Sequence, residues 1–322
     1  MTFRVAVVGA GLSGLVAARR LRAAGARATV FDKGRRPGGR ANTREHGHRR
    51  YDHGAQYFTV REREVGEMRD TWLERGLVAE WKGRLVRLEG KTATEAKPST
   101  RYVAVPGMID LALHLAEGLD VQVGVRVGRV ERIGTEWSLA DVDGKRLGSY
   151  DRVVIATPAP QAVPLLEGAP ALQHRAARMR MEPSWATMLS FDEVLPLQFD
   201  GAFVVDGPFS WIARDSSKPG RAQDEAWVVH MTPEWTRDYW DEPHDAIPDY
   251  VLGALIGRFG ALPVPTFTRS HRWGYALASG DADGILYDPD LGIGACGDWC
   301  VGGRVEGALM SGLEIARRVI GD

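Results

Sequence analysis

The sequence is poor in cysteine, with Cys296 and Cys300 as its two. That number excludes a disulfide framework and favours a reducing compartment, so we expect a cytoplasmic protein. Three residues separate the two thiols, and the second pair of ligands that a zinc site needs is missing, so we expect no metal site. Uninterrupted apolar runs of about 18 residues are also missing, which excludes a transmembrane helix. The apolar N-terminus has a glycine spacing that indicates a fold element and not a signal peptide.

The chain also lacks a charge imbalance, since 41 basic and 42 acidic residues give a net charge of −1. Attraction of the whole chain to nucleic acid or to an anionic membrane is therefore not expected, and small molecules are the expected partners. Lysine accounts for 6 of the basic residues and arginine for 35, which either favours phosphate binding or, as we interpret it, reflects a compositional bias. The 322 residues, 44% of them hydrophobic, suffice for about two folded domains.

A glycine motif near the N-terminus lies between two predicted elements. The apolar run Val5 to Val8 predicts a strand, and Leu12 to Leu21 predict a helix. In this context Gly9 permits a tight turn, Gly11 lets the backbone approach a pyrophosphate, and Gly14 lets the helix pack closely on the strand. The helix start would offer free N–H groups to the phosphates. We assign cofactor contacts to Gly9, Gly11, Leu12, Ser13 and Gly14.

The second predicted strand, Ala28 to Phe31, ends at an acidic residue. Asp32 follows Gly14 by 18 positions, where a carboxylate can accept hydrogen bonds from a ribose hydroxyl. In the glycine-rich turn that comes next, the backbone would approach the ligand and an arginine would bind its diphosphate; an ordinary basic surface turn is the alternative. The residues of this turn are Lys33, Gly38, Gly39 and Arg40.

A second glycine-rich motif lies near the C-terminus, after a strand predicted at Leu291 to Cys296. Asp298 could bind ribityl hydroxyls, and the helix predicted from Val305 to Ile320 could direct its free N–H groups at N1 and C2=O of a flavin. A glycine-rich loop with a packing helix is the alternative. Together the two motifs predict non-covalently bound FAD, with contacts here at Gly297, Asp298, Gly303, Val305 and Ala308.

The fold class that these patterns predict is α/β. We expect a Rossmann-like FAD-binding domain of the two-dinucleotide-binding type, with an inserted substrate domain that contains a mixed or antiparallel β-sheet. Residues 121–133 alternate as one β segment, and aromatic-rich strands dominate from Met181 to about Leu286, with one long helix near 243–260. The expected FAD-binding domain comprises residues 1–62, 100–168 and 287–322, and the expected substrate domain comprises residues 63–99 and 169–286.

From Val8 to Arg40 the sequence resembles the FAD-binding signature of the flavin amine oxidase superfamily, in which the acid at the strand end is usually Glu and is here Asp32. Nearly the whole chain is similar to the bacterial renalase-like branch, through Asp52–Thr59, Val105–Met108, Trp211–Arg221, His271–Ala276 and Cys296–Cys300. The resemblance implies a non-covalent FAD oxidase that converts non-metabolic dihydronicotinamide isomers of NAD(P)H to NAD(P)+ and reduces dioxygen to hydrogen peroxide. Further predicted cofactor contacts are Gly54, Ala55, Gln56, Val127 and Thr157.

For the electron donor we expect a mostly aromatic pocket with few ionisable groups, because hydride loss from a dihydropyridine needs no base. His271 is a candidate proton acceptor, although a lone histidine is more often structural, as a single aromatic residue is more often part of a core. Arg214 and Lys218 could bind substrate phosphate, and a solvated turn is an equal alternative for Lys218. The predicted catalytic set is Gln56, Tyr57, Trp211, Arg214, His271, Trp273 and Tyr275.

Other functions stay open from the sequence alone. A flavin amine oxidase acting on a small amine has the same motifs, and a non-catalytic flavin-binding sensor or carrier would need only part of them. An NAD-linked dehydrogenase without flavin would leave the turn at Gly38 to Arg40 and the C-terminal motif without a role. The complete set of substrate-domain motifs favours the enzyme.

Overall fold

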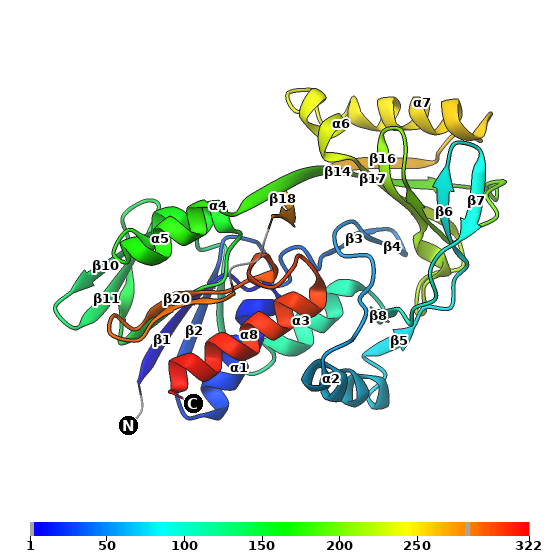
Figure 1. Cartoon of the computed structure of the whole chain (residues 1–322). Helices are drawn as coiled ribbons and strands as arrows, with labels where there is room; N and C mark the ends of the chain where they lie inside the picture. The colour runs from blue at the N-terminus through cyan, green and yellow to red at the C-terminus, as the bar shows by residue number, and fades with distance from the viewer. Residues whose placement is uncertain (1–2, 281–283, 322) are drawn as a thin grey trace.

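The computed structural model describes residues 3–280 and 284–321. A six-stranded sheet in the order β19-β20-β13-β1-β2-β9 forms its first layer (Figure 1). Neighbouring strands in it are parallel, except that β19 is antiparallel to β20. β1 and β13 read as apolar runs because parallel strands of this kind are buried on both faces. The strands are β1 (Arg4–Val8), β2 (Arg27–Asp32), β9 (Asp120–Val123), β13 (Arg152–Ile155), β19 (Leu286–Asp288) and β20 (Ile293–Ala295).

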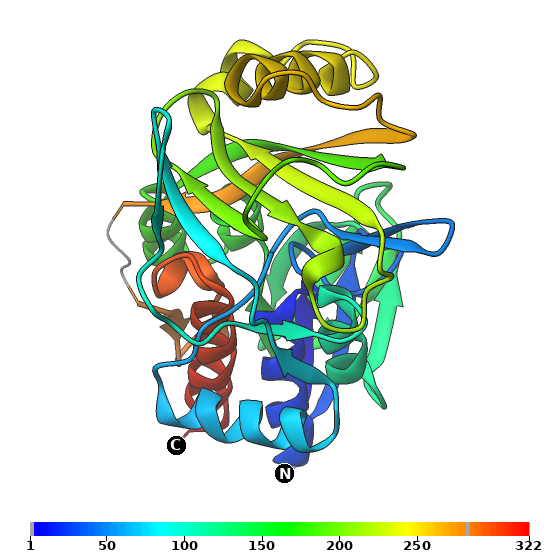
Figure 2. The ribbon, with the colours of Figure 1, turned by 90° about the vertical axis from the view of Figure 1, so that its right-hand side faces the viewer.

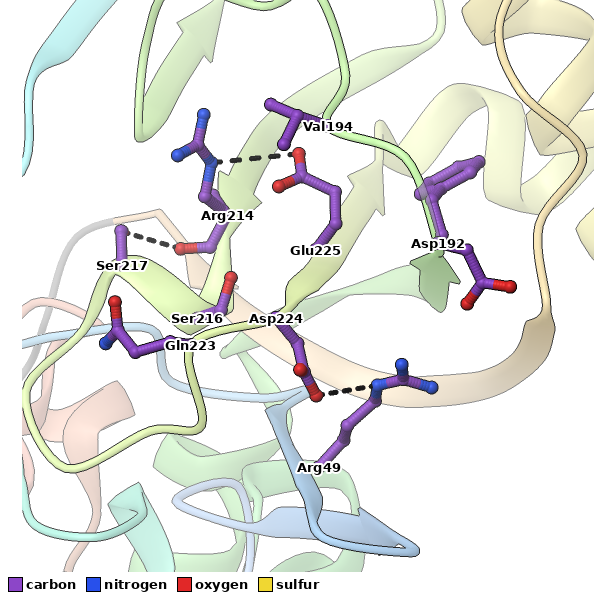
Figure 3. A pocket seen from close by; sticks show the side chains of 10 residues that line it. Arg49, Asp192, Val194, Arg214, Ser216, Ser217, Gln223, Asp224 and Glu225 are labelled. Atoms are coloured by element: carbon purple, nitrogen blue, oxygen red, sulfur yellow. Dashed lines mark hydrogen bonds and ion pairs between the residues drawn. The ribbon is translucent and has the colours of Figure 1, made fainter.

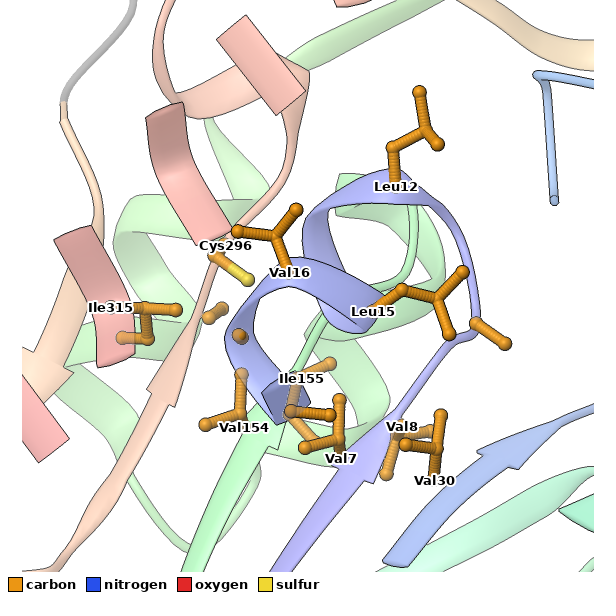
Figure 4. Packing of buried hydrophobic residues seen from close by; sticks show 14 of the residues in the cluster. Val7, Val8, Leu12, Leu15, Val16, Val30, Val154, Ile155, Cys296 and Ile315 are labelled. Atoms are coloured by element: carbon orange, nitrogen blue, oxygen red, sulfur yellow. The ribbon is translucent and has the colours of Figure 1, made fainter. Parts of the chain in front are cut away.

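Helices from the two ends of the chain pack together on this sheet. α1 (Leu12–Ala23) lies against α8 (Val305–Ile320), with α3 (Met108–Ala116) on its other side (Figure 1). A Cβ on Gly312 of α8 would meet the Ser13 carbonyl oxygen at 2.3 Å, which shows how closely the helices approach. Ser13 Oγ hydrogen-bonds to Cys296 Sγ (3.1 Å) and to Ser311 Oγ (2.9 Å). Leu15 and Val16 of α1 complete the core with Val7, Ile155 and Ile315 (Figure 4).

The alternating segment 121–133 forms two strands, so the prediction of one β segment is wrong. β9 ends in the first sheet, and β10 (Val127–Ile133) starts a three-stranded antiparallel sheet with β11 (Glu136–Asp141) and β12 (Arg146–Tyr150). The strand breaks because Gly124 has φ +72°, a left-handed conformation that glycine adopts without steric cost. Gly124 N donates to Gly34 O (2.7 Å), which holds the break beside the loop after β2.

A seven-stranded sheet in the order β18-β14-β17-β16-β15-β6-β7 forms the second layer. Figure 2 shows it between the first layer and two helices, α6 (Pro233–Asp238) and α7 (Ile247–Phe259), which cover its outer face. The sheet is mixed, because β15 pairs with β6 in parallel and its other pairs are antiparallel. Its strands are β6 (Leu85–Glu89), β7 (Thr92–Glu95), β14 (Arg180–Phe191), β15 (Gly201–Val204), β16 (Phe209–Arg214), β17 (Glu225–Met231) and β18 (Phe267–Ser279).

Short elements join the two layers. The hairpin of β3 (Thr43–His46) and β4 (Arg49–Asp52) reaches from the first layer to the second, and β5 (Val78–Glu80) pairs with β8 (Tyr102–Ala104). α2 (Arg63–Glu74), which the sequence assigned to the inserted domain, packs on α8. No described helix is long and apolar enough to cross a membrane. The remaining elements are α4 (Ala159–Ala162), η1 (Val163–Leu166), α5 (Pro170–Ala177), η2 (Asp215–Ser217) and η3 (Asp298–Cys300).

Candidate functional site

Two glycine loops are in contact where β1 and β2 end. Gly38 N donates to Ala10 O (2.8 Å), and Gly11 and Gly38 form a bridge. Gly11 begins α1 in an extended conformation with no side-chain cap. A Cβ on Gly11 would have no heavy atom within 4 Å, whereas one on Gly39 (φ +54°) would lie 3.4 Å from Gly11 Cα. Open space in front of uncapped helix N–H groups is the geometry that a pyrophosphate requires.

Gly9 and Gly14 differ from Gly11 because the protein itself occupies the space around them. Gly9 has φ +115°, and its Cβ would lie 2.7 Å from Ala156 O. A Cβ on Gly14 would lie 2.0 Å from Gly9 O. These two glycines are therefore needed for the tight turn and the close helix packing, and Gly11 leaves room for a ligand.

The carboxylate of Asp32 holds the loops on either side of it. Its Oδ2 accepts from Ala10 N and its Oδ1 from Gly34 N, both at 2.6 Å. Each oxygen keeps a further lone pair, so a ribose hydroxyl can still bind. Val125 N donates to Asp32 O (2.9 Å), which brings the buried Val127 at the start of β10 close to this edge. Burial, together with the nearby Arg126, lowers the pKa of Lys33.

Arg40 and Asp298, which the sequence assigned to different parts of the cofactor, form an ion pair with each other. Arg40 Nη1 donates to Asp298 Oδ2 (2.9 Å), and Nη2 donates to Oδ1. Arg40 Nη1 also donates to Ala276 O of β18 (3.2 Å). A bidentate pair fixes the orientation of both groups. Gly303, with φ +73°, donates its N–H to Asp298 O (2.9 Å), so the N-terminal loop, the C-terminal motif and the second layer meet at this point.

Thr157 presents a buried hydroxyl at the carboxyl end of β13. Its Oγ1 has no hydrogen-bond partner within residues 3–280 and 284–321, although its carbonyl accepts from Trp299 Nε1 (3.0 Å). Thr157 follows Ala156, the residue that Gly9 approaches. Ligands of open α/β sheets bind at this edge, and a buried hydroxyl without a partner needs one. The open Gly11 loop and the Thr157 hydroxyl fit a dinucleotide cofactor.

The N-terminus of α8 lies on the same side of the molecule as the glycine loops and Asp298. The helix starts after Arg304 with no side-chain cap, and its free N–H groups come from the segment around Val305. Glu306 is turned away from the loops, because its Oε1 accepts from Arg61 N (2.5 Å) and Glu62 N (2.8 Å). Ala308 N already donates within the helix, to Arg304 O (2.9 Å). The residues just before Ala308 are therefore the ones that can donate to a ligand.

On the inner face of the seven-stranded sheet, five residues from neighbouring strands form one row. The register pairs Phe203 with Trp211, Trp211 with His230, His230 with Ala186, and Ala186 with His271. Directly opposed residues of a sheet lie on the same face, so this row crosses the sheet as a continuous wall. The rings of Phe203 and Trp211 are 4.7 Å apart. We call these five residues the inner row.

His53 and Trp273 connect the inner row with the glycine loops. Trp273 Nε1 donates to His53 O (2.8 Å), and the rings of His53 and His271 are 5.0 Å apart. A Cβ on Gly54 would lie 2.0 Å from Arg40 O and 3.4 Å from the Trp273 ring. The backbone at Gly54 and Ala55 therefore runs between the Arg40 loop and the inner row.

Three histidines of this region are uncharged at neutral pH. Burial, followed by electrostatic repulsion from His271 and Arg44, lowers the pKa of His53 to about 3. Burial also lowers the pKa of His230 to about 4, and burial with the charge of Arg44 lowers that of His271 to about 4. His53 Nδ1 is buried and lacks a partner among the described residues. His271 can accept a proton, but it is a weak base.

Arg214 lies on the face of the seven-stranded sheet opposite to the inner row, so we correct its predicted catalytic role. It opposes Trp227 in the register, and its guanidinium lies 5.5 Å from the Trp227 ring centre on the outer face. Figure 3 shows Arg214 beside Glu225, at a cavity of about 420 Å³ away from the inner row. Three positions separate Arg214 from Trp211, and an odd spacing in a strand puts two side chains on opposite faces.

Lys218 is not a solvated turn residue, and its ammonium is paired inside the protein and not open to a substrate phosphate, so both predictions for it are corrected. Its side chain is fully buried, with Nζ 2.5 Å from Asp215 Oδ1 and 3.2 Å from Asp52 Oδ2. Arg221 Nη2 donates to the same Asp52 oxygen (2.6 Å). Burial acts to raise the pKa of Asp52, but the charges of Lys218 and Arg221 hold it below its usual value. We call these four residues, two acids and two bases, the buried ion cluster.

Gln56 joins the buried ion cluster to the inner row. Its Oε1 accepts from Lys218 Nζ and from Trp211 Nε1, both at 3.2 Å. Its Nε2 donates to Asp52 O and to Gly54 O. Because both amide atoms bond within the protein, Gln56 positions Trp211 and Gly54, and we correct its predicted catalytic role to a positioning role.

Tyr57 lies at the Trp211 end of the inner row, whereas Tyr275 lies outside the row on β18. The Tyr57 ring is 5.6 Å from that of Trp211, and the Arg101 guanidinium lies 5.4 Å from the Tyr57 ring centre. Tyr275, further along β18 from Trp273, is 36% exposed. Sequence reasoning missed His230, although a histidine in the apolar strand β17 is a recognisable signal. It also missed Asp52, His53, Arg101, Asp215 and Arg221.

The fold and these loops define a dinucleotide-binding protein of the α/β class. Residues 7–72 match the model of a protein family described as "NAD(P)-binding Rossmann-like domain". Residues 83–320 match the model of the family "Flavin containing amine oxidoreductase". The chain belongs to the flavin containing amine oxidoreductase family. The predicted superfamily, fold class, enzyme class and FAD cofactor are thereby confirmed.

Individual relatives either match less than half of the chain or share little of its sequence. Phytoene desaturase (neurosporene-forming) of Rhodobacter capsulatus is 32% identical over 148 residues, which are 46% of this chain and 24% of the desaturase. Protoporphyrinogen oxidase 2 of Arabidopsis thaliana is 45% identical over 67 residues, which are 21% of this chain and 13% of that protein. The chain thus matches a quarter or less of these relatives. Cyclohexylamine oxidase from Brevibacterium oxydans IH-35A shares the fold, with a TM-score of 0.77, 13% identity and 99% coverage of both chains.

Proposed function

We propose that the protein is a renalase-like FAD-dependent oxidase. Its donors would be dihydronicotinamide isomers of NAD(P)H that carry the extra hydrogen at the 2- or 6-position of the ring. One turnover takes a hydride from the donor, takes up one proton and reduces one dioxygen. The products are NAD(P)+ and hydrogen peroxide. We also propose that it acts in the cytoplasm and that its chain divides into the two domains expected from the sequence.

The main support for this proposal is that the side chains of the inner row are uncharged. Its members are aromatic, small or neutral histidine side chains, and none is acidic. The nearby carboxylates of Asp52 and Asp215 are fully buried and paired with Lys218 and Arg221. Among the described residues, an ammonium substrate would therefore find no free carboxylate along this row, and burying an unpaired charge is costly. A flat, uncharged dihydropyridine suits the row better than an amine.

FAD, when bound, supplies the hydride acceptor and passes the electrons to dioxygen. The loops at Gly11 and Gly38, the carboxylates of Asp32 and Asp298 and the Thr157 hydroxyl would hold it. The start of α8 would stabilise negative charge with its free N–H groups.

The donor would lie along the inner face of the sheet between Trp211 and Trp273, with Tyr57 at one edge. Gln56 keeps the Trp211 indole fixed, which maintains the donor in a reactive position. Hydride loss leaves an aromatic pyridinium, so no group has to remove a proton from the donor. The low pKa of His271 is compatible with that chemistry, since the residue need not act as a base.

Product analysis tests the proposal. In air, the purified protein should convert the 2- or 6-dihydro isomers to NAD(P)+ with one hydrogen peroxide formed for each donor consumed. Chromatography of the nucleotides and a peroxidase-coupled assay measure the two products. Consumption of the donor without peroxide would contradict the oxidase assignment, and so would peroxide formation with an amine but not with these isomers.

A further inference from the structure

An arginine of the β3–β4 hairpin faces the second layer, and no acidic residue in the described part of the chain pairs with it. Arg44 opposes Tyr51 in the hairpin register, so the two side chains lie on one face. That face packs on β18, because the Tyr51 ring lies 5.5 Å from the Phe267 ring and His46 stacks on Phe267 at 3.9 Å. Arg44 is half-buried between these contacts.

A second arginine lies on the facing strand. Arg269 is two residues after Phe267 and two before His271, so the three share the inner face of β18. Neither Arg44 nor Arg269 makes an ion pair within the part of the chain that the structure describes. The hairpin's acids, Glu45 and Asp52, are on the opposite face, where Glu45 pairs with Arg50 (3.1 Å) and Asp52 pairs with Arg221 (2.6 Å). Two cations thus lie close enough to repel each other, and both carboxylates of the hairpin are on its other face.

The surroundings of Arg44 favour an anion. Burial, followed by the positive charges of Arg269, Arg36 and Arg35, lowers the pKa of Arg44. Arg36 is held in place because it donates to Asn42 Oδ1 (3.1 Å) and to Thr43 O. Like charges that are partly desolvated repel one another, and a bound anion would remove that cost. Arginine is suited to this role because its planar donors match phosphate oxygens.

The two arginines, Arg44 and Arg269, lie next to the inner row. Arg269, His271 and Trp273 follow one another on one face of β18, and strand geometry puts about 13 Å between the first and the third. The His53 and His271 rings, 5.0 Å apart, lie between the arginines and the backbone at Gly54. A ligand with a flat ring on Trp273 could therefore extend a ribose-linked phosphate to Arg44 and Arg269.

We propose that Arg44 and Arg269 bind the phosphate groups of a dinucleotide substrate. The proposal rests on the proposed function for the ring end of that substrate. It assigns the adjoining cationic site to the phosphate end, where Arg36 adds charge. The loops at Gly11 and Gly38, not this pair, would bind the phosphates of FAD.

The test compares a double variant, Arg44→Gln with Arg269→Gln, with a control of equal charge change, Arg129→Gln with Arg132→Gln, at two exposed arginines of β10. Calorimetry at low salt on the flavin-loaded protein measures binding of inorganic pyrophosphate, oxidised NAD+ and nicotinamide. The first variant should bind pyrophosphate and NAD+ about tenfold or more weakly, because charge-assisted hydrogen bonds are lost. Its affinity for nicotinamide and its flavin content should not change, and the control should resemble the unmodified protein. Arg269→Gln alone, at an exposed position, repeats the test if the double variant does not fold.

Unchanged NAD+ affinity in the first double variant, or an equal loss in both double variants, would overturn the proposal. Loss of pyrophosphate binding with NAD+ binding intact would overturn the substrate assignment and indicate a site for free phosphate. A failure of the proposed function can be distinguished from a failure of the phosphate site. If no dihydronicotinamide is oxidised but NAD+ and pyrophosphate still depend on Arg44 and Arg269, the phosphate site stands without the oxidase.

Discussion

Replacing Gly11 with valine is expected to abolish flavin retention and to leave the polypeptide folded. Gly11 is extended, with φ −73° and ψ 173°, which a valine can adopt. Its Cβ would meet no atom of the described residues within 4 Å. The added side chain would instead occupy the space that the pyrophosphate needs beside the start of α1. We expect the dissociation constant of FAD to rise on the order of 100-fold, equivalent to about 2.7 kcal/mol. Flavin absorbance per protein after gel filtration, followed by titration with FAD, measures it.

Two other glycines serve as controls for Gly11. Gly14→Val should destabilise the protein itself, because its Cβ would lie 2.0 Å from Gly9 O. Gly253→Ala, in α7 with no atom within 4 Å of its Cβ, should keep both flavin and stability, with a gain of up to about 1 kcal/mol. Normal flavin content in Gly11→Val would show that the cofactor does not approach this loop.

Replacing Lys218 with methionine is expected to lower the free energy of unfolding by about 3 to 5 kcal/mol, because it leaves a buried negative charge without compensation. Asp52, Asp215 and Lys218 are fully buried, and Arg221 would be the only cation left in the buried ion cluster. The variant should also release Gln56 from one of its two donors, so that Trp211 is held less firmly. Urea denaturation followed by circular dichroism measures the change.

The matched control is Lys145→Met at an exposed position, which should change the free energy of unfolding by less than about 0.5 kcal/mol. Adding Asp215→Asn to Lys218→Met restores neutrality in the buried ion cluster and should recover a large part of the loss. A loss below about 1 kcal/mol for Lys218→Met alone would contradict a desolvated cluster.

The FAD-binding layer could be predicted from the sequence because its signals are local. A strand, three glycines and a helix stand together in one short segment, and each glycine has a steric reason. The helix at Val305 to Ile320 was predicted with its observed bounds because apolar periodicity is a local property as well. The break at Gly124 was missed, since alternation continues on both sides of it and only the positive φ ends the strand.

The substrate side could be predicted only in part, because strand register and burial are properties of the tertiary structure. Trp211 and Arg214 lie in one motif, but the alternation of β16 sends them to opposite faces. Applying that alternation to the motif would have separated them. Lys218 follows a short 3-10 helix and looks like a surface residue, and its burial depends on Asp52, which is far away in the sequence. The inner row needs four strand pairings that no single segment encodes.

The central claim is that the site oxidises a dihydropyridine and not an amine. Stopped-flow absorbance of the flavin under anaerobic conditions tests it most directly, with three donors: a 2- or 6-dihydro isomer of NAD(P)H, ordinary 4-dihydro NADH and a simple primary amine. We predict rapid bleaching by the first donor and far slower bleaching by the other two, because a wall fixed by Trp211 and Trp273 holds one ring carbon in position and a misplaced donor loses that advantage. Air should restore the absorbance. Fast bleaching by the amine, with none by the dihydronicotinamide isomers, would contradict the account and identify an amine oxidase.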